Sequence, residues 1–274
     1  MAEIIAISNQ KGGVGKTTTA TNLASALACL SQETLLVDID PQANATSGMG
    51  FEKKDKPTIY EVLLGTADIK SAIRQSPVEW LDVLCSNKDL TGAEIELVTE
   101  LARESRLKTA LAEVRDNYKY IIIDCPPSLG ILTINALVAS DRVIIPIQCE
   151  YYALEGLAHF IETINKVRIA LNPKLEIEGP VFTMFDARIS LSNQVKAEVE
   201  KFFKNKSYKT TIPRNIRLAE APSFGQPIFL YDPRSKGAES YMNFAMEMLQ
   251  RRGISGLPKE YLLKPEATSA AEVA

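Results

Sequence analysis

A glycine-rich loop with two lysines lies between an apolar run and a helical segment near the start of the chain. The run EIIAIS occupies 3–8, QKGGVGKTT follows at 10–18, and TATNLASALACL continues from there as a good helix-forming segment. A strand, a glycine loop and a helix in this order form a phosphate-binding unit. The loop therefore constrains the fold strongly, because it needs a strand end on one side and a helix N-terminus on the other.

The residue types of the loop suit a nucleotide triphosphate. The glycines let backbone N–H groups turn toward an anion, and the following helix adds its partial positive charge. Lys16 is expected to reach the β- and γ-phosphates, and Thr17 is expected to ligate Mg²⁺. Position 10 is Gln where the general pattern has a first glycine, and an additional lysine stands at 11. ATP and Mg²⁺ are the predicted cofactors, and the predicted nucleotide-contacting residues of the loop are Lys11, Gly12, Gly13, Val14, Gly15, Lys16, Thr17 and Thr18.

Short apolar runs alternate with amphipathic segments along most of the chain, a rhythm typical of buried parallel strands joined by helices. It predicts an α/β fold with a doubly wound, mostly parallel sheet flanked by helices. We expect one domain over 1–256 and a flexible tail over 257–274, where Pro, Glu, Ser, Thr and Ala predominate. The predicted strands are 3–8, 34–40, 81–85, 120–125, 142–147, 178–184 and a segment around 209–212.

For two helical segments in the second half of the chain, the sequence allows predictions about single residues. In 191–203 the apolar residues Leu191, Val195, Val199 and Phe202 recur at three- and four-residue spacing, which predicts one buried stripe. The run 153–171 holds the sole histidine of the chain, His159, to which we assign no role.

Acidic residues end two of the predicted strands. Asp38 and Asp40 close LLVDID, and Asp124 closes YIIID. Ligands of open α/β sheets bind at the carboxyl ends of the strands, so these side chains are expected to converge on the nucleotide. A helix cap or an ordinary strand-end acid is the structural alternative for Asp40 and Asp124.

Two motifs carry a resemblance to a known family. The loop KGGVGKTT resembles the deviant Walker A box of the ParA, MinD and nitrogenase iron-protein superfamily. TTIPRNIRLAEAPSFGQPI and YDPRSKGAESY, in the second half, resemble the carboxyl-terminal signature of ParA/Soj chromosome-partitioning ATPases. The resemblance runs from about Ile4 to Leu249. It implies a slow, partner-stimulated ATP hydrolase of the P-loop class.

The resemblance also implies roles for single residues. Lys11 would contact the phosphates of ATP held by the other subunit of a homodimer, where it supplies positive charge to the transition state. Asp40 would orient the attacking water, so Lys11, Lys16 and Asp40 are the predicted catalytic residues. Asp124 would act as the Walker B carboxylate near Mg²⁺. We assign Asp38 a supporting role at the metal site.

Further positions follow from the family's motifs. The segment 126–130, PPSLG, resembles a switch region that senses the γ-phosphate, although a turn capped by Ser128 explains the same residues. Pro213 and Asn215 are the predicted contacts to the base through backbone groups, with a simple turn as the alternative.

DNA binding is expected from a local patch, because the formal net charge is −3. By the resemblance, Arg188 and Arg217 would contact double-stranded DNA without sequence preference, while Arg214, Arg234 and Lys236 lie in the same half. A ParB/Spo0J-like protein would stimulate hydrolysis. The expected location is cytoplasmic and nucleoid-associated, and no stable membrane association is expected, since no run of 18 apolar residues occurs.

Two other functions stay open at this point. A MinD-like membrane switch needs a lipid-binding terminal helix, and the tail lacks a cationic amphipathic face. A reductase similar to the nitrogenase iron protein needs thiolates at a dimer axis. The four cysteines are far apart in sequence and are expected to be buried reduced thiols: Cys29, Cys85, Cys125 and Cys149.

Overall fold

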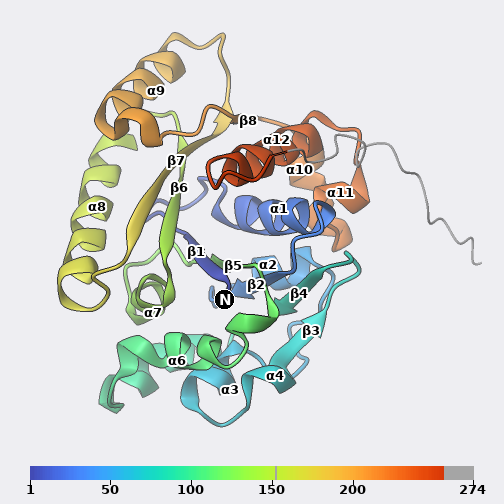
Figure 1. Ribbon diagram of the computed structural model, residues 1–274, viewed down its shortest axis with the longest axis vertical. Helices are drawn as coiled ribbons and strands as arrows, with labels where there is room; N and C mark the ends of the chain where they lie inside the picture. Colours follow the sequence, from blue (N-terminus) through green and yellow to red (C-terminus); the bar gives the residue numbers. More distant parts are fainter. Residues whose placement is uncertain (152, 256–274) are drawn as a thin grey trace, which may run out of the picture.

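An eight-stranded sheet with helices on both faces forms the core of the computed structural model, which describes residues 1–151 and 153–255 (Figure 1). The strand order is β3-β4-β2-β5-β1-β6-β7-β8, and β3 is antiparallel to β4 while the other neighbours are parallel. The strands are β1 (Glu3–Ile7), β2 (Thr34–Asp38), β3 (Ile73–Gln75), β4 (Leu81–Leu84), β5 (Tyr120–Asp124), β6 (Arg142–Gln148), β7 (Glu176–Phe185) and β8 (Thr211–Pro213).

The helices fill the connections between the strands. They are α1 (Lys16–Cys29), α2 (Asn44–Gly48), α3 (Ile59–Leu64), α4 (Ile69–Ala72), α5 (Leu90–Glu96), α6 (Arg106–Ala112), α7 (Ile131–Ala139), α8 (Ala153–Ala170), α9 (Ser190–Phe203), α10 (Ile216–Glu220), α11 (Ile228–Tyr231) and α12 (Lys236–Gln250). Short 3-10 turns are η1 (Leu97–Thr99), η2 (Arg103–Ser105), η3 (Arg115–Asn117), η4 (Lys204–Lys206) and η5 (Ala221–Phe224).

The central strands are apolar on both faces because helices cover both. On β1, Ile4 and Ala6 pack into the core that includes α7 and α8, while Ile5 and Ile7 pack into the core that includes α1 and α12. Successive side chains of a strand point to opposite faces, so a strand buried on both sides must be apolar throughout. Figure 1 shows α1 and α12 side by side on one face of the sheet.

The predicted doubly wound sheet is confirmed, and each of the seven expected segments overlaps a strand. The antiparallel edge strand β3 was not predicted. It has three residues, Ile73, Arg74 and Gln75, none of them fully buried, so its sequence lacks the apolar run of a central strand.

The predicted stripe of the 191–203 helix is wrong at two of its four positions. Val195 and Val199 are buried, but Leu191 is 41% exposed and Phe202 is 64% exposed. Phe203 is buried in place of Phe202. The helix lies at the β7 side of the sheet, where it has one narrow contact face, and spacing alone does not tell which of two adjacent phenylalanines faces it.

The predicted helix over 153–171 is confirmed as α8, and His159 is exposed on it. Among the described residues, no helix has both the length and the apolar character that crossing a membrane requires. The tail predicted over 257–274 lies outside the described residues.

Candidate nucleotide-binding site

The loop between β1 and α1 has the backbone shape that its glycines predict. Gly13 and Gly15 have φ of 73° and 82°, in the left-handed region that side chains disfavour. A Cβ added at Gly12 or Gly13 would meet no atom within 4 Å, so the conformation, and not crowding within the chain, favours glycine at 13. Val14 is buried, and its carbonyl accepts a hydrogen bond of 2.8 Å from the Thr183 hydroxyl of β7. The loop therefore leaves open space beside Gly12 and Gly13, just before α1.

The two lysines of the loop occupy different environments. Lys16 is 6% exposed, and its Nζ donates a hydrogen bond of 2.9 Å to the backbone carbonyl of Lys11. Burial lowers the pKa of the Lys16 ammonium, while the nearby Asp124 carboxylate opposes that shift. The Lys11 side chain is 35% exposed, and its Nζ lies 2.5 Å from Oε2 of Glu150. One ammonium thus lies within the loop and the other on the surface beside it.

The three predicted acids meet at the carboxyl edge of the sheet, as expected. Asp38 on β2 is the direct register partner of Asp124 on β5. Both oxygens of Asp38 accept hydrogen bonds: Oδ2 from the backbone and hydroxyl of Thr46, both at 2.8 Å, and Oδ1 from the N–H of Asp40 at 3.1 Å. Burial raises the pKa of Asp38 to about 6 although these donors oppose the shift.

Asp124 differs from Asp38 in its hydrogen bonds. It is fully buried, and neither carboxylate oxygen has a hydrogen-bond partner within the described chain. Burial, together with the Asp38 carboxylate, raises the pKa of Asp124 well above its usual range, while Thr17 and Lys16 lie near enough to favour its charged form. A buried carboxylate without donors is costly unless a cation or water completes it.

These residues fit Mg²⁺ bound together with phosphates. Mg²⁺ takes oxygen ligands and is commonly held by one or two side chains plus substrate phosphates and water. The Asp124 carboxylate and the Thr17 hydroxyl are oxygens of this kind. Within 1–151 and 153–255, no group of three His, Cys, Asp or Glu side chains could hold a metal by itself. The ion would therefore arrive with the nucleotide.

Asp40 closes the turn after β2. It is 7% exposed, and its Oδ1 accepts a hydrogen bond of 2.9 Å from the Gln42 N–H. The backbone carbonyl of Asp40 accepts another of 2.8 Å from the Ser86 hydroxyl, so the backbone is fixed independently of the carboxylate. The chain positions this side chain at the same edge as the loop.

Pro213 and Asn215 lie at a pocket of about 170 Å³ that also adjoins the loop at Gly15 and Thr18. The side-chain oxygen of Asn215 accepts a hydrogen bond of 3.2 Å from Leu218 N–H and caps α10. Contact with a base through the backbone groups of Pro213 and Asn215 stays a prediction.

Sequence reasoning missed two other walls of this pocket. Met184 of β7 has a left-handed φ of 48°, unusual for a residue with a side chain. Tyr241 comes from α12, and its hydroxyl lies 3.2 Å from that of Thr19. No local motif marks either residue, because both reach the loop through tertiary packing alone.

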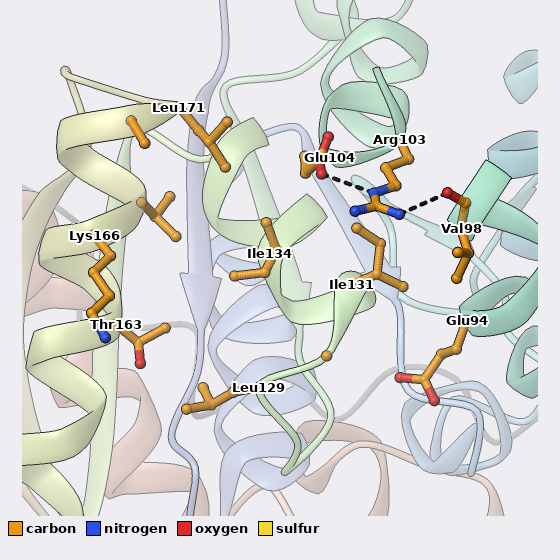
Figure 2. A pocket seen from close by; sticks show the side chains of 13 residues that line it. Glu94, Val98, Arg103, Glu104, Leu129, Ile131, Ile134, Thr163, Lys166 and Leu171 are labelled. Atoms are coloured by element: carbon orange, nitrogen blue, oxygen red, sulfur yellow. Dashed lines mark hydrogen bonds and ion pairs between the residues drawn. The ribbon is translucent and has the colours of Figure 1, made fainter. Parts of the chain in front are cut away.

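The segment 126–130 joins β5 to α7. The N-cap of α7 is Gly130 without a side-chain cap, so the suggested cap by Ser128 is wrong. The Ser128 carbonyl instead accepts a hydrogen bond of 2.6 Å from the Thr133 hydroxyl. A cavity of about 540 Å³ adjoins this segment at Leu129 and Gly130. Figure 2 shows Lys166 on one wall and Arg103 on the other. None of the residues that line this cavity belongs to the glycine loop.

The two predicted DNA-binding arginines are paired with acids of their own chain. The Arg188 side chain is 90% exposed and forms a fork on Asp186, with distances of 2.9 and 2.7 Å. Arg217 lies 3.0 Å from Glu220 and 3.3 Å from Asp232. Exposed pairs of this kind are weak and can be exchanged for phosphate oxygens. Of the other cations, Lys236 pairs with Glu239.

Comparison with known proteins places this geometry in a family. A family model described as an AAA domain matches residues 2–177. The chain is 59% identical over 249 residues to the sporulation initiation inhibitor protein Soj of Bacillus subtilis (strain 168), covering 90% of this chain and 98% of that protein. The chain belongs to the ParA/Soj family. A chromosome partitioning protein ParA of Myxococcus xanthus is 53% identical over 252 residues, covering 92% and 89% of the two chains.

Solved structures extend the agreement for this ParA/Soj-family chain. Cobyrinic acid a,c-diamide synthase from Mycobacterium smegmatis, solved with an ATP analogue and magnesium, superposes with a TM-score of 0.80. It is 35% identical, and the match covers 94% of this chain and 98% of that one. The predicted P-loop fold is confirmed, and so is the prediction of ATP and Mg²⁺ as cofactors. Family membership also favours the ParA/Soj reading over the MinD-like and reductase-like alternatives.

Proposed function

We propose that this chain is an ATP-hydrolysing switch that dimerises with ATP, binds duplex DNA without sequence preference, and segregates a chromosome or plasmid. The observation that carries the proposal is the separation of the two loop lysines. Lys16 lies within its own loop, while the Lys11 ammonium lies on the surface, 35% exposed, where a second subunit can reach it. One loop thus provides a cation for its own nucleotide and another for a neighbour's.

The chemistry at each position follows from its surroundings. Lys16 and the backbone N–H groups of the loop would bind the phosphates, and Thr17 with Asp124 would hold Mg²⁺, which neutralises phosphate charge. Asp40 would orient the attacking water. Asp38 would support the metal site by fixing the backbone of Asp40 and of Thr46, since both its oxygens already accept hydrogen bonds from those residues.

The DNA surface would form from Arg188 and Arg217 of both subunits. A dimer doubles the number of phosphate contacts, so a subunit that binds DNA weakly alone binds much more tightly when paired. Hydrolysis would then release the dimer from DNA. A ParB/Spo0J-like partner would speed this slow step at its cargo, while subunits that still hold ATP elsewhere would stay associated with the nucleoid.

The test compares nucleotide states of one protein. Light scattering after gel filtration and fluorescence anisotropy of labelled duplex DNA are measured with ATP, with ADP and without nucleotide. We expect dimers and DNA binding with ATP alone, and we expect Lys16→Ala to bind no nucleotide and Lys11→Ala to bind ATP as a monomer. Equal DNA binding with ATP and ADP contradicts the proposal.

A further inference from the structure

Lys11 is held at three points by its own subunit. Its side-chain Nζ lies 2.5 Å from Oε2 of Glu150, and its backbone N–H donates a hydrogen bond of 3.1 Å to Oδ1 of Asn9. Its carbonyl accepts the 2.9 Å hydrogen bond from Lys16 Nζ. Asn9 is itself buried and donates a 2.7 Å hydrogen bond to the carbonyl of Pro146 on β6. Lys11 is thus tied to β6 indirectly through Asn9, and to the segment after β6 directly through Glu150.

We propose that Glu150 is a positioning residue for Lys11, which keeps the ammonium on its own subunit until the phosphates of an ATP-loaded partner replace the carboxylate. The proposal rests on the proposed function, in which Lys11 serves the other subunit. Glu150 suits the role because its backbone is fixed, with its carbonyl accepting a 3.0 Å hydrogen bond from Ala153, while its side chain is 48% exposed. A lysine ammonium is a compact, mobile charge that can exchange one anion for another.

The contact between Lys16 and the Lys11 carbonyl links the subunit's own nucleotide to this release. When phosphates occupy the loop, Lys16 is expected to turn from that carbonyl to the β- and γ-phosphates. Lys11 then loses one of its two backbone contacts, while Asn9 still holds its N–H and Glu150 still holds its ammonium. ATP in the subunit's own loop therefore first removes one contact to Lys11. The phosphates of the partner's ATP then bind the Lys11 ammonium.

The size of the effect is set by exposure. Exposed ion pairs are weak, so removing the carboxylate is expected to favour the ATP-bound dimer by only about two- to fivefold. The triphosphate carries more negative charge than one carboxylate, so the exchange proceeds in the wild type as well. Because the pair is exposed, salt screens it, and the difference between variant and wild type should shrink as ionic strength rises.

Two measurements test the assignment. Sedimentation velocity with a non-hydrolysed ATP analogue gives the dimer dissociation constant of wild type, Glu150→Gln, Lys11→Ala, the double variant, and Glu155→Gln as a matched control. Glu155 lies in the first turn of α8 and is exposed, so its replacement removes the same charge nearby. The second measurement is the rate at which an amine-acetylating reagent modifies Lys11 in the nucleotide-free monomer, followed by mass spectrometry.

We expect Glu150→Gln to tighten the dimer and to speed Lys11 acetylation, each by about two- to fivefold. Glu155→Gln should change neither, and the double variant should dimerise no better than Lys11→Ala. Weaker or unchanged dimerisation of Glu150→Gln, an unchanged acetylation rate, or a gain that persists without Lys11 overturns the proposal. If wild type stays monomeric with the analogue, the proposed function fails first, and the acetylation rate still decides whether Glu150 holds Lys11.

Discussion

Asp38 and Asp124 are register partners on the neighbouring parallel strands β2 and β5, yet their carboxylates differ completely in their hydrogen bonds. Asp38 accepts three, from Thr46 and Asp40, whereas neither oxygen of Asp124 has a partner within the described chain. The two neighbouring buried acids therefore have different roles. Asp38 fixes the turn that carries Asp40, and Asp124 is left with a ligand requirement that Mg²⁺ and its waters would meet.

Asp124→Asn should weaken magnesium-dependent ATP binding by about 10- to 100-fold, the usual effect of losing a group that orders a metal site. Isothermal titration calorimetry with ATP, in the presence of Mg²⁺ or of EDTA, measures this affinity. Without nucleotide the variant should be at least as stable as wild type, because the amide removes a buried carboxylate that has no donor. Asp55→Asn, at an exposed position, is the matched control. Unchanged magnesium-dependent affinity would rule out the metal role of Asp124.

Asp40→Ala should bind ATP with nearly wild-type affinity but hydrolyse it about 10²- to 10⁴-fold more slowly, the range for removal of a group that handles the attacking water. The ATP-bound dimer should then persist. Single-turnover hydrolysis and light scattering over the same time course provide the measurement. Hydrolysis at the wild-type rate would remove Asp40 from the mechanism. The Ser86 bond to the Asp40 backbone is retained, so the turn should keep its shape.

Arg188→Ala should weaken binding to all DNA sequences alike and lower the slope of log affinity against log salt by about 1 for each subunit. A guanidinium that is 90% exposed contributes little to folding, so stability should be unchanged. Anisotropy titrations over a range of salt concentrations give the slope. Arg168→Ala, which removes an exposed arginine from α8, is the control. Equal slopes for both variants would contradict the DNA contact.

Glu178→Gln should lower the free energy of unfolding at pH 7 by about 1.5–3 kcal/mol, the range for hydrogen bonds to charged groups. Burial alone would raise the pKa of Glu178, but Arg252, Tyr208 and Arg142 outweigh it and lower the pKa. The hydroxyl of Tyr208 donates a bond of 2.8 Å, and the guanidinium of Arg252 lies at 3.1 Å.

The sign of the pH dependence follows from that lowered pKa. The stabilisation is complete above the carboxyl's ordinary pKa of about 4.3 and is lost as the pH falls through the folded-state value. Urea unfolding at pH 7 and at pH 3.5 should therefore show the gap between wild type and Glu178→Gln shrinking in acid. A gap of constant size would mean that the Glu178 charge does not stabilise the fold.

Much of the architecture could be predicted because local physics specifies it. Apolar runs such as YIIID at 120–124 must be buried on both faces, and the glycines of the loop allow backbone angles that other residues avoid. The convergence of Asp38 and Asp124 could also be predicted, because the carboxyl ends of parallel strands lie at one edge of the sheet. β3 has no apolar run, so hydrophobic periodicity could not predict this strand.

The tertiary structure decided which neighbours each predicted residue meets. That Phe203 and not Phe202 is buried, that Met184 and Tyr241 line the pocket beside Pro213, and that Glu150 contacts Lys11 all depend on contacts between distant segments. The sequence by itself determined the element types and the phosphate loop, because backbone preference and hydrophobic periodicity act over a few residues. Pairings such as that of Lys11 with Glu150, 139 positions apart, depend on how the whole sheet is assembled, and only the folded chain specifies them.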